Sequence, residues 1–279
     1  MLQSFSFTGD APGPHLLCLG GVHGNEPCGV VALRRITDRL SGGGNRLKAG
    51  RLTVIPCCNE MACAKDVIYI DQNLNRCVRK YDAPRNNEQK AAHELTSFID
   101  QCDIMIDLHS TTAPTVPFGF LDTDSPAGRD LARAVGLGKI LIGWPALYPD
   151  DKDPTTQTYA EAAGKLALTI ECGQHADAAA PDRAEYYVLN ALSFLGMTAG
   201  PAPLPSVSPA YLRMTGVFYQ KDQLSFVKSW QNFMPVKSGD PIAANDKGGL
   251  IAAPYDGEII MPRAVAKDGE ELFYMATAI

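Results

Sequence analysis

Four polar residues from three separate points of the chain could together bind a metal ion and use it. His23 and Glu26 lie in the segment His23-Gly24-Asn25-Glu26, directly after the apolar run 15–21. His109 ends Asp107-Leu108-His109, and Glu171 ends the apolar run 166–170. Two imidazoles and one carboxylate can hold a catalytic zinc ion whose fourth position stays open to water. The residue types therefore predict a metallohydrolase.

Each of these side chains has an expected role. His23, Glu26 and His109 are the expected ligands of one zinc ion per chain, with Asp107 or a nearby carbonyl orienting an imidazole from behind. A carboxylate at the end of an apolar run is costly unless it faces a cation or a polar cavity. Glu171 is thus the expected general base and acid, acting on metal-bound water and the leaving amine. Singly, these residues could instead cap a turn, sit in the core or face solvent; the combination favours the metal site.

A second motif is suited to binding a carboxylate. In Asp71-Gln72-Asn73-Leu74-Asn75-Arg76, an amide stands next to a planar guanidinium. Asn75 and Arg76 could hold a substrate carboxylate through paired hydrogen bonds. The alternative is a surface loop with an ion pair, and the spacing alone does not distinguish the two.

The secondary-structure elements that must position these residues are predicted to form an α/β fold. Apolar runs at 16–20, 51–57, 104–108 and 166–171 predict strands of a mostly parallel sheet, and amphipathic stretches at 28–40, 87–101 and 182–195 predict flanking helices. In open α/β sheets the ligand crevice lies at the carboxyl ends of the strands. Three predicted strands deliver candidate site residues to that edge.

The last part of the chain differs from the first. Residues 201–209 are rich in proline, and beyond them short strand-like runs alternate with Gly-Asp and Asp-Gly turns. We therefore expect a zinc-hydrolase α/β domain at 1–200, a Pro-rich linker at 201–209 and a small all-β domain at 210–279.

Composition limits the possible partners. The chain has 279 residues, 46% of them apolar and 20% charged, with 25 basic against 31 acidic side chains. Without a Lys/Arg cluster, nucleic acid and anionic membranes are not expected partners. The N-terminus lacks signal-peptide features and no run reaches the roughly 18 apolar residues of a membrane span, so we expect a cytoplasmic protein with reduced cysteines. A homo-oligomer is compatible with this composition.

Taken in order and spacing, the motifs resemble those of the aspartoacylase/succinylglutamate desuccinylase family, a branch of the zinc carboxypeptidase fold. The resemblance rests on four segments and covers nearly the whole chain: His23-Gly24-Asn25-Glu26, Tyr69-Ile70-Asp71 with Asn75-Arg76, Asp107-Leu108-His109, and Ile170-Glu171-Cys172-Gly173. It implies zinc-dependent hydrolysis of the amide joining an acyl group to an amino acid. By the same resemblance Asn75 and Arg76 hold the substrate carboxylate, and Tyr274 matches a tyrosine that the C-terminal domain lends to the site.

Two departures from the family pattern concern the substrate. Where family members place an arginine that polarises the scissile carbonyl, this chain has Ile68; Lys65, Arg76 or Arg79 could replace it. Loss of one such stabilising group costs about 10²- to 10³-fold in rate. Glu161 stands in place of a substrate-binding arginine of aspartate-specific members. It would repel the side-chain carboxylate of N-acetylaspartate, so we expect a different amino acid or amine.

Three functions compete at this point. The first is a zinc-dependent amidohydrolase that removes the acyl group from an N-acyl amino acid or a related amide. The second is a zinc carboxypeptidase acting on short peptides, because an Asn-Arg pair also grips a peptide's terminal carboxylate. The third is a non-catalytic zinc- or ligand-binding homologue that has lost carbonyl polarisation at Ile68.

Overall fold

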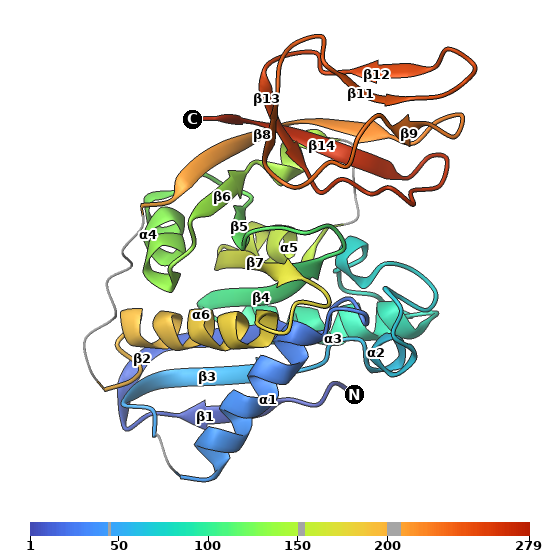
Figure 1. Cartoon of the computed structure of the whole chain (residues 1–279). Coiled ribbons are helices and arrows are strands. Elements are labelled where there is room, and N and C mark those ends of the chain that lie inside the picture. The colour runs from blue at the N-terminus through green and yellow to red at the C-terminus, as the bar shows by residue number, and fades with distance from the viewer. Residues whose placement is uncertain (44–45, 150–153, 200–207) are drawn as a thin grey trace.

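A long mixed β-sheet runs through the whole molecule (Figure 1). The computed structural model describes residues 1–43, 46–149, 154–199 and 208–279. In chain order the elements are β1 (Phe5–Thr8), β2 (Ala11–Gly20), α1 (Pro27–Ser41), β3 (Ala49–Ile55), α2 (Glu60–Lys65), the 3₁₀ helix η1 (Leu74–Arg76), α3 (Asn87–Gln101), β4 (Ile104–Thr111), β5 (Phe118–Leu121), α4 (Pro126–Val135), β6 (Lys139–Ile142), the 3₁₀ helix η2 (Trp144–Leu147), α5 (Thr156–Ala162), β7 (Leu166–Gln174), α6 (Ala180–Phe194), β8 (Ala210–Tyr219), β9 (Ser225–Phe226), β10 (Met234–Val236), β11 (Pro241–Ala244), β12 (Leu250–Ala252), β13 (Gly257–Ile260) and β14 (Glu271–Ala278).

The central strands are parallel, as predicted. The sheet order is β1-β3-β2-β4-β7-β5-β6-β8-β14-β13-β10, and β3, β2, β4 and β7 are parallel neighbours. These four are the strands expected from the apolar runs. The mostly parallel α/β sheet with a small antiparallel C-terminal sheet is therefore confirmed. The structure adds β5, which is antiparallel to β7, and β6, which continues the sheet toward β8.

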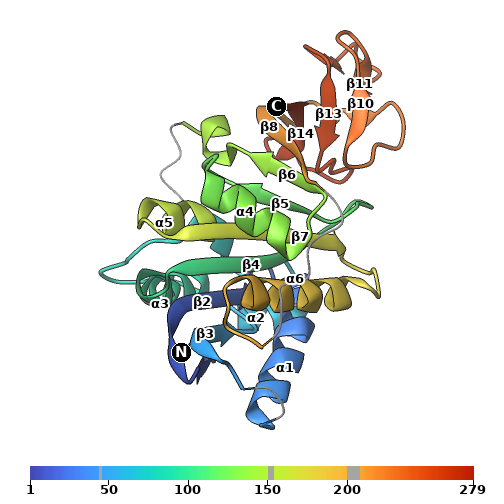
Figure 2. The same ribbon diagram turned by 90° about the vertical axis from the view of Figure 1, so that its left-hand side faces the viewer.

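Helices cover both faces of the central strands (Figures 1 and 2). Side chains alternate between the two faces of a strand. Leu16 and Cys18 of β2 therefore pack with residues of α1 and α6, whereas Leu17 packs with residues of α3 on the other face. In the same alternation His109 and Glu171 point to the α3 face, because Met105 and Ala167 on their strands pack there. The site thus forms on one face of the sheet, at the carboxyl ends of its strands.

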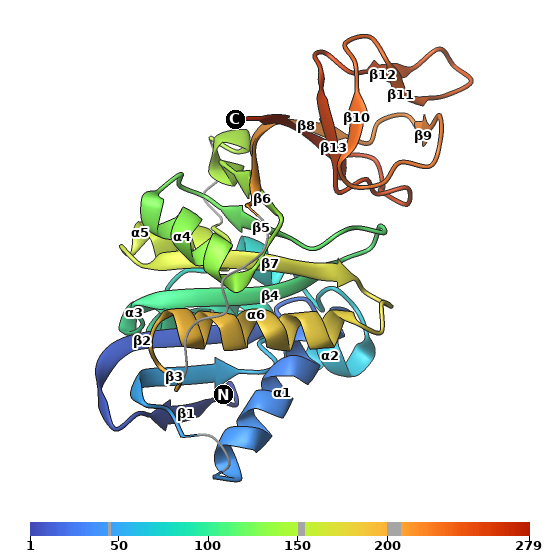
Figure 3. The same ribbon diagram turned by 60° about the vertical axis from the view of Figure 1, so that its left-hand side comes forward.

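The C-terminal unit joins the same sheet from its far end (Figure 3). Strand β8 pairs in parallel with β6 and antiparallel with β14, and β9, β11 and β12 form a separate three-stranded sheet. Trp230 and Phe273 are buried in the unit's own apolar core. Of the expected linker at 201–209, residues 201–207 lie outside the described residues. We keep the domain division as a proposal in which the two units share hydrogen-bonded strands.

Two properties bear on the environment of the chain. All eight cysteines are free thiols, and Cys63 alone among them is not fully buried. None of the helices within the described ranges has both the length and the hydropathy that crossing a bilayer requires.

Candidate active site

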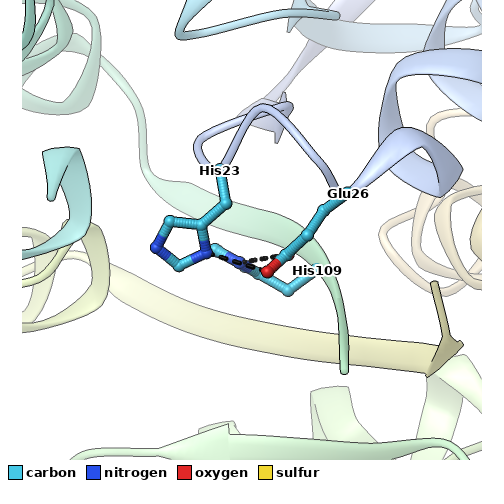
Figure 4. Close-up of side chains that lie close together, drawn as sticks. All are labelled: His23, Glu26 and His109. Carbon is cyan, nitrogen blue, oxygen red and sulfur yellow. Dashed lines mark hydrogen bonds and ion pairs between the residues drawn. The ribbon is translucent and has the colours of Figure 1, made fainter. Parts of the chain in front are cut away.

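His23, Glu26 and His109 converge on one point, with the carboxylate of Glu26 between the two imidazoles (Figure 4). Glu26 Oε1 lies 2.9 Å from His23 Nδ1, and Glu26 Oε2 lies 2.9 Å from His109 Nδ1. One donor atom from each residue lies within 4.8 Å of the other two. This is the only such group of three among the described residues, and it is the trio that the sequence predicted.

A tight turn between β2 and α1 carries the first two members. Glu26 is the residue before the first turn of α1, where the helix dipole favours a negative charge. Gly24 packs against α2 so closely that a Cβ atom there would lie 2.1 Å from the backbone of Ala62. The Gly24 amide also donates to Ile68 O at 3.2 Å. A side chain at position 24 would therefore push the turn, and with it His23, away from the site.

A hydrogen bond behind His23 and an ion pair behind His109 indicate which nitrogen of each imidazole faces the centre. His23 Nε2 lies 3.0 Å from Asn73 Oδ1, and His109 Nε2 lies 3.0 Å from Asp107 Oδ2. Because both oxygens can only accept, each Nε2 carries the proton. Each histidine consequently presents Nδ1 to Glu26. Such support from behind is typical of histidines that bind metals. The expected partner Asp107 serves His109, and Asn73 was not foreseen.

The electrostatics of the trio suit a cation. Burial alone would raise the pKa of Glu26, but the charges of His23 and His109 hold it well below its usual range. Burial works to lower the pKa of His109, yet Asp107 and Glu26 raise it well above the ordinary value. An anionic carboxylate and a protonated imidazole thus neutralise each other where the residues meet. A divalent ion could take the place of that proton, so the donor set fits a metal.

Glu171 lies beside the trio on the neighbouring strand. It is paired in register with His109 across β4 and β7, and only 8% of the residue is exposed. No described residue forms a hydrogen bond with its Oε2 atom. Burial, and after it the charge of Glu26, raises the pKa of Glu171 to about 8. A buried carboxyl oxygen without a hydrogen-bond donor costs free energy. Its presence here indicates that a ligand binds at this position.

Asn75 and Arg76 line the same cavity from η1. The backbone amide of Thr156 donates to Asn75 Oδ1 at 2.9 Å, which leaves the Asn75 amide N–H groups for the cavity. The guanidinium of Arg76 stacks 5.1 Å from the centre of the Trp144 ring. In the described parts of the chain Arg76 has no ion-pair partner. An unpaired cation next to an amide donor is suited to a substrate carboxylate.

Tyr274, from β14, lines the cavity next to Trp144. Its hydroxyl lies 2.9 Å from that of Tyr148, and its ring lies 5.0 Å from the Trp144 ring. Burial raises the pKa of Tyr274, so the hydroxyl stays protonated and can donate. The structure therefore brings all seven sequence-predicted site residues to one cavity of about 670 Å³.

The two departures from the family pattern have different surroundings. Ile68 lines the cavity, and of the three suggested replacements for the missing arginine only Arg76 does so; Lys65 and Arg79 do not line it. Glu161 is not at the cavity wall either. It lies behind Gln157 and Asp122, accepting from Gln157 Nε2 at 3.1 Å and from the Asp122 amide at 3.1 Å.

Several residues of the site were missed from the sequence. Thr156 connects the carboxylate-binding motif to the metal-binding residues. Its amide donates to Asn75, and its hydroxyl donates to Asp107 at 2.6 Å. Trp144 and Asp122 follow the short strands β6 and β5, which were not predicted. Their position after a strand is the signal that could have found them, had those strands been recognised.

Comparison with known proteins identifies the family to which this chain is similar. Residues 12–195, more than half of the chain, match the model of the succinylglutamate desuccinylase/aspartoacylase catalytic domain. A similar curated protein is the N-alpha-acetyl-L-2,4-diaminobutyric acid deacetylase of Halomonas elongata, 26% identical over 258 residues, which cover 88% of this chain and 71% of the relative.

Solved structures agree with the fold. A succinylglutamate desuccinylase/aspartoacylase from Rhodobacter sphaeroides superposes with a TM-score of 0.79 at 19% identity, covering all of this chain and 88% of the other. The product-bound ectoine utilization protein EutE (DoeB) of Ruegeria pomeroyi gives a TM-score of 0.76 at 22% identity, covering 96% and 87%. The match of the catalytic-domain model, on a chain whose motifs meet in one cavity, shows that this protein belongs to the succinylglutamate desuccinylase/aspartoacylase family.

Proposed function

We propose that the chain hydrolyses the amide bond of a small N-acylated amino acid, with one zinc ion held by His23, Glu26 and His109. Members of its family are amide-bond hydrolases, and the His-Glu-His group could hold a metal ion, as is typical of this zinc-dependent family. The observation that carries the proposal is Glu171. Its buried and unpartnered carboxyl oxygen faces the same cavity as three metal-donor side chains.

Each side chain has a defined task in this proposal. When bound, a zinc ion supplies positive charge that polarises the substrate carbonyl and lowers the pKa of water. Glu171 takes up a proton from the attacking water and hands it to the leaving nitrogen. Asn75 and Arg76 hold the carboxylate of the amino acid, and the Tyr274 hydroxyl donates a hydrogen bond to the substrate.

The size and charge of the cavity support a small acylated amino acid. About 670 Å³ falls in the range of small-molecule sites. The Halomonas elongata relative is named a deacetylase of an acetylated diamino acid, and the Ruegeria pomeroyi structure contains a bound product. The guanidinium of Arg76, which has no ion-pair partner among the described residues, offers such a molecule a partner for its carboxylate.

A substrate panel tests the proposal. Zinc-loaded protein is assayed with N-acetyl, N-succinyl and N-formyl amino acids beside dipeptides and tripeptides, and released amines are quantified. We expect kcat/KM for at least one N-acyl amino acid to exceed that for every peptide by orders of magnitude. Preferred cleavage of peptides would establish the carboxypeptidase instead. Saturable binding without product would establish a non-catalytic binding protein.

A further inference from the structure

We propose that Asp122 selects substrates whose amino-acid part carries a positively charged side chain, as in a diamino acid. This inference rests on the proposed function, because it assigns the substrate class of the same cavity. It goes beyond the Asn75-Arg76 motif by naming a second charged contact at a residue that follows β5.

The strand register places Asp122 at a suitable distance from the reacting amide. Phe118 of β5 is paired with Glu171 of β7, and Phe120 with Thr169. Asp122 continues this alternation two residues beyond Phe120, and it lines the cavity together with Phe120 and Thr169. Four residues of strand correspond to about 13 Å of backbone. An amino acid whose side chain runs along the strand direction, away from Glu171, would extend toward Asp122.

Within the described residues, Asp122 has no direct ion-pair partner, although the charge of Arg76 acts on it through space. Its Oδ2 accepts one hydrogen bond, from Thr158 Oγ1 at 2.6 Å. No ion pair to Asp122 occurs within the described ranges of the chain. The nearest acidic neighbour makes the local field more negative, because the Glu161 carboxylate sits directly behind and binds the Asp122 amide. A half-buried carboxylate in a cavity, without an ion-pair partner among the described residues, can accept a cation from the ligand.

The titration of Asp122 agrees with this geometry. Burial raises its pKa to about 7; the charge of Glu161 adds to the rise, whereas the Thr158 hydroxyl and Arg76 oppose it. A bound ammonium would favour the charged form. Arg76 and Asp122 then offer one positive and one negative partner in a single cavity. An N-acylated diamino acid has the matching pair, a carboxylate and a free side-chain ammonium.

The first test uses the wild-type protein and two substrates of nearly equal shape. N-acetyl-L-2,4-diaminobutyrate ends in an ammonium, and N-acetyl-L-norvaline ends in a methyl group at the same position. A hydrogen bond to a charged group predicts that kcat/KM for the cationic substrate is roughly 10- to 100-fold higher. Equal values, or a preference for norvaline or for N-acetylaspartate, would overturn the inference.

Two variants then assign the preference to a residue. In Asp122→Asn the ratio of the two kcat/KM values should fall to within about 3-fold. Asp124→Asn is the matched control, because Asp124 lies in the same loop but is held at the surface by Arg129, at 2.6 Å, and does not line the cavity. It should keep the wild-type ratio. An unchanged ratio in Asp122→Asn would remove Asp122 from substrate selection.

Binding separates failure of this inference from failure of the proposed function. Calorimetry with zinc-loaded Glu171→Gln protein measures Kd for both compounds without turnover. If neither compound is hydrolysed by the wild type but the cationic one binds more tightly, the hydrolase proposal fails and the selection by Asp122 stands. If both are hydrolysed and bind equally well, the hydrolase stands and the role of Asp122 is refuted.

Discussion

The two ends of the cavity are built in different ways. At the metal-binding end, His109, Glu26 and Glu171 are 2 to 8% exposed, and hydrogen bonds or strand register hold each of them. At the far wall, the Trp144 ring contacts the Tyr274 ring, and the Tyr274 hydroxyl binds that of Tyr148, while the backbone of Tyr274 is held in β14 between β13 and β8. Part of that wall comes from the loop between β13 and β14, where Val265 is 80% exposed.

This difference suggests that the metal-binding end carries out the reaction and that the far wall determines which substrate is bound. Carboxyl ends of parallel strands give fixed positions, which a reaction at one point requires. Loops and aromatic contacts can change without disturbing the sheet, and so they can adapt the cavity to different acyl groups or amino acids. We therefore expect substitutions at the metal end to abolish turnover, and those at the far wall to change substrate preference while turnover is retained.

The largest effect is expected for His23→Ala. Removing one imidazole leaves Glu26 and His109 as the remaining donors, and so the zinc content of purified, zinc-replete protein should fall well below one ion per chain together with activity. Metal analysis and a turnover assay measure the two quantities. His93→Ala is the matched control, because His93 lies exposed on α3 outside the cavity. Full zinc content in His23→Ala would contradict the assignment of His23 as a ligand.

Glu171→Gln is expected to have the next largest effect. The amide keeps the shape of the carboxyl group but cannot accept a proton, so kcat should fall by about 10²- to 10⁴-fold. Zinc content should stay at the wild-type value, since Glu171 is not among the donors. Glu185→Gln, on the other face of the sheet, should retain full turnover. A fully active Glu171→Gln enzyme would exclude Glu171 from the mechanism.

The contrast between the two ends also explains what the sequence could predict. The helix at 87–101 was predicted with the bounds that α3 has, and the four parallel strands were found from their apolar runs. Parallel strands buried on both faces are continuous and apolar, and their carboxyl ends meet at one edge. That rule was sufficient to bring His23, His109 and Glu171 together before any coordinates.

The far wall follows from no comparable rule. Strands β5 and β6 have four residues each, too few for a periodic pattern to distinguish a strand from other structure. The antiparallel insertion of β5 against β7 depends on tertiary pairing, and so the sequence did not reveal Asp122 or Trp144 as cavity residues. The family pattern predicts Glu161 as a substrate contact, but on α5 it lies behind the cavity wall and accepts a hydrogen bond from the Asp122 amide.

The smallest effect is expected for Tyr274→Phe, and it decides whether the far wall touches the substrate. The hydroxyls of Tyr274 and Tyr148 bind each other at 2.9 Å, so either Phe substitution breaks that bond. Tyr274 lines the cavity and Tyr148 does not. Loss of a neutral hydrogen bond to the substrate is worth about 0.5 to 1.5 kcal/mol, which predicts a 2- to 12-fold lower kcat/KM for Tyr274→Phe. Tyr148→Phe should stay within about 2-fold of the wild type, because its lost bond is internal to the wall. Equal losses in both variants would mean that the hydroxyl pair only positions the aromatic rings, and Tyr274 would then be a positioning residue.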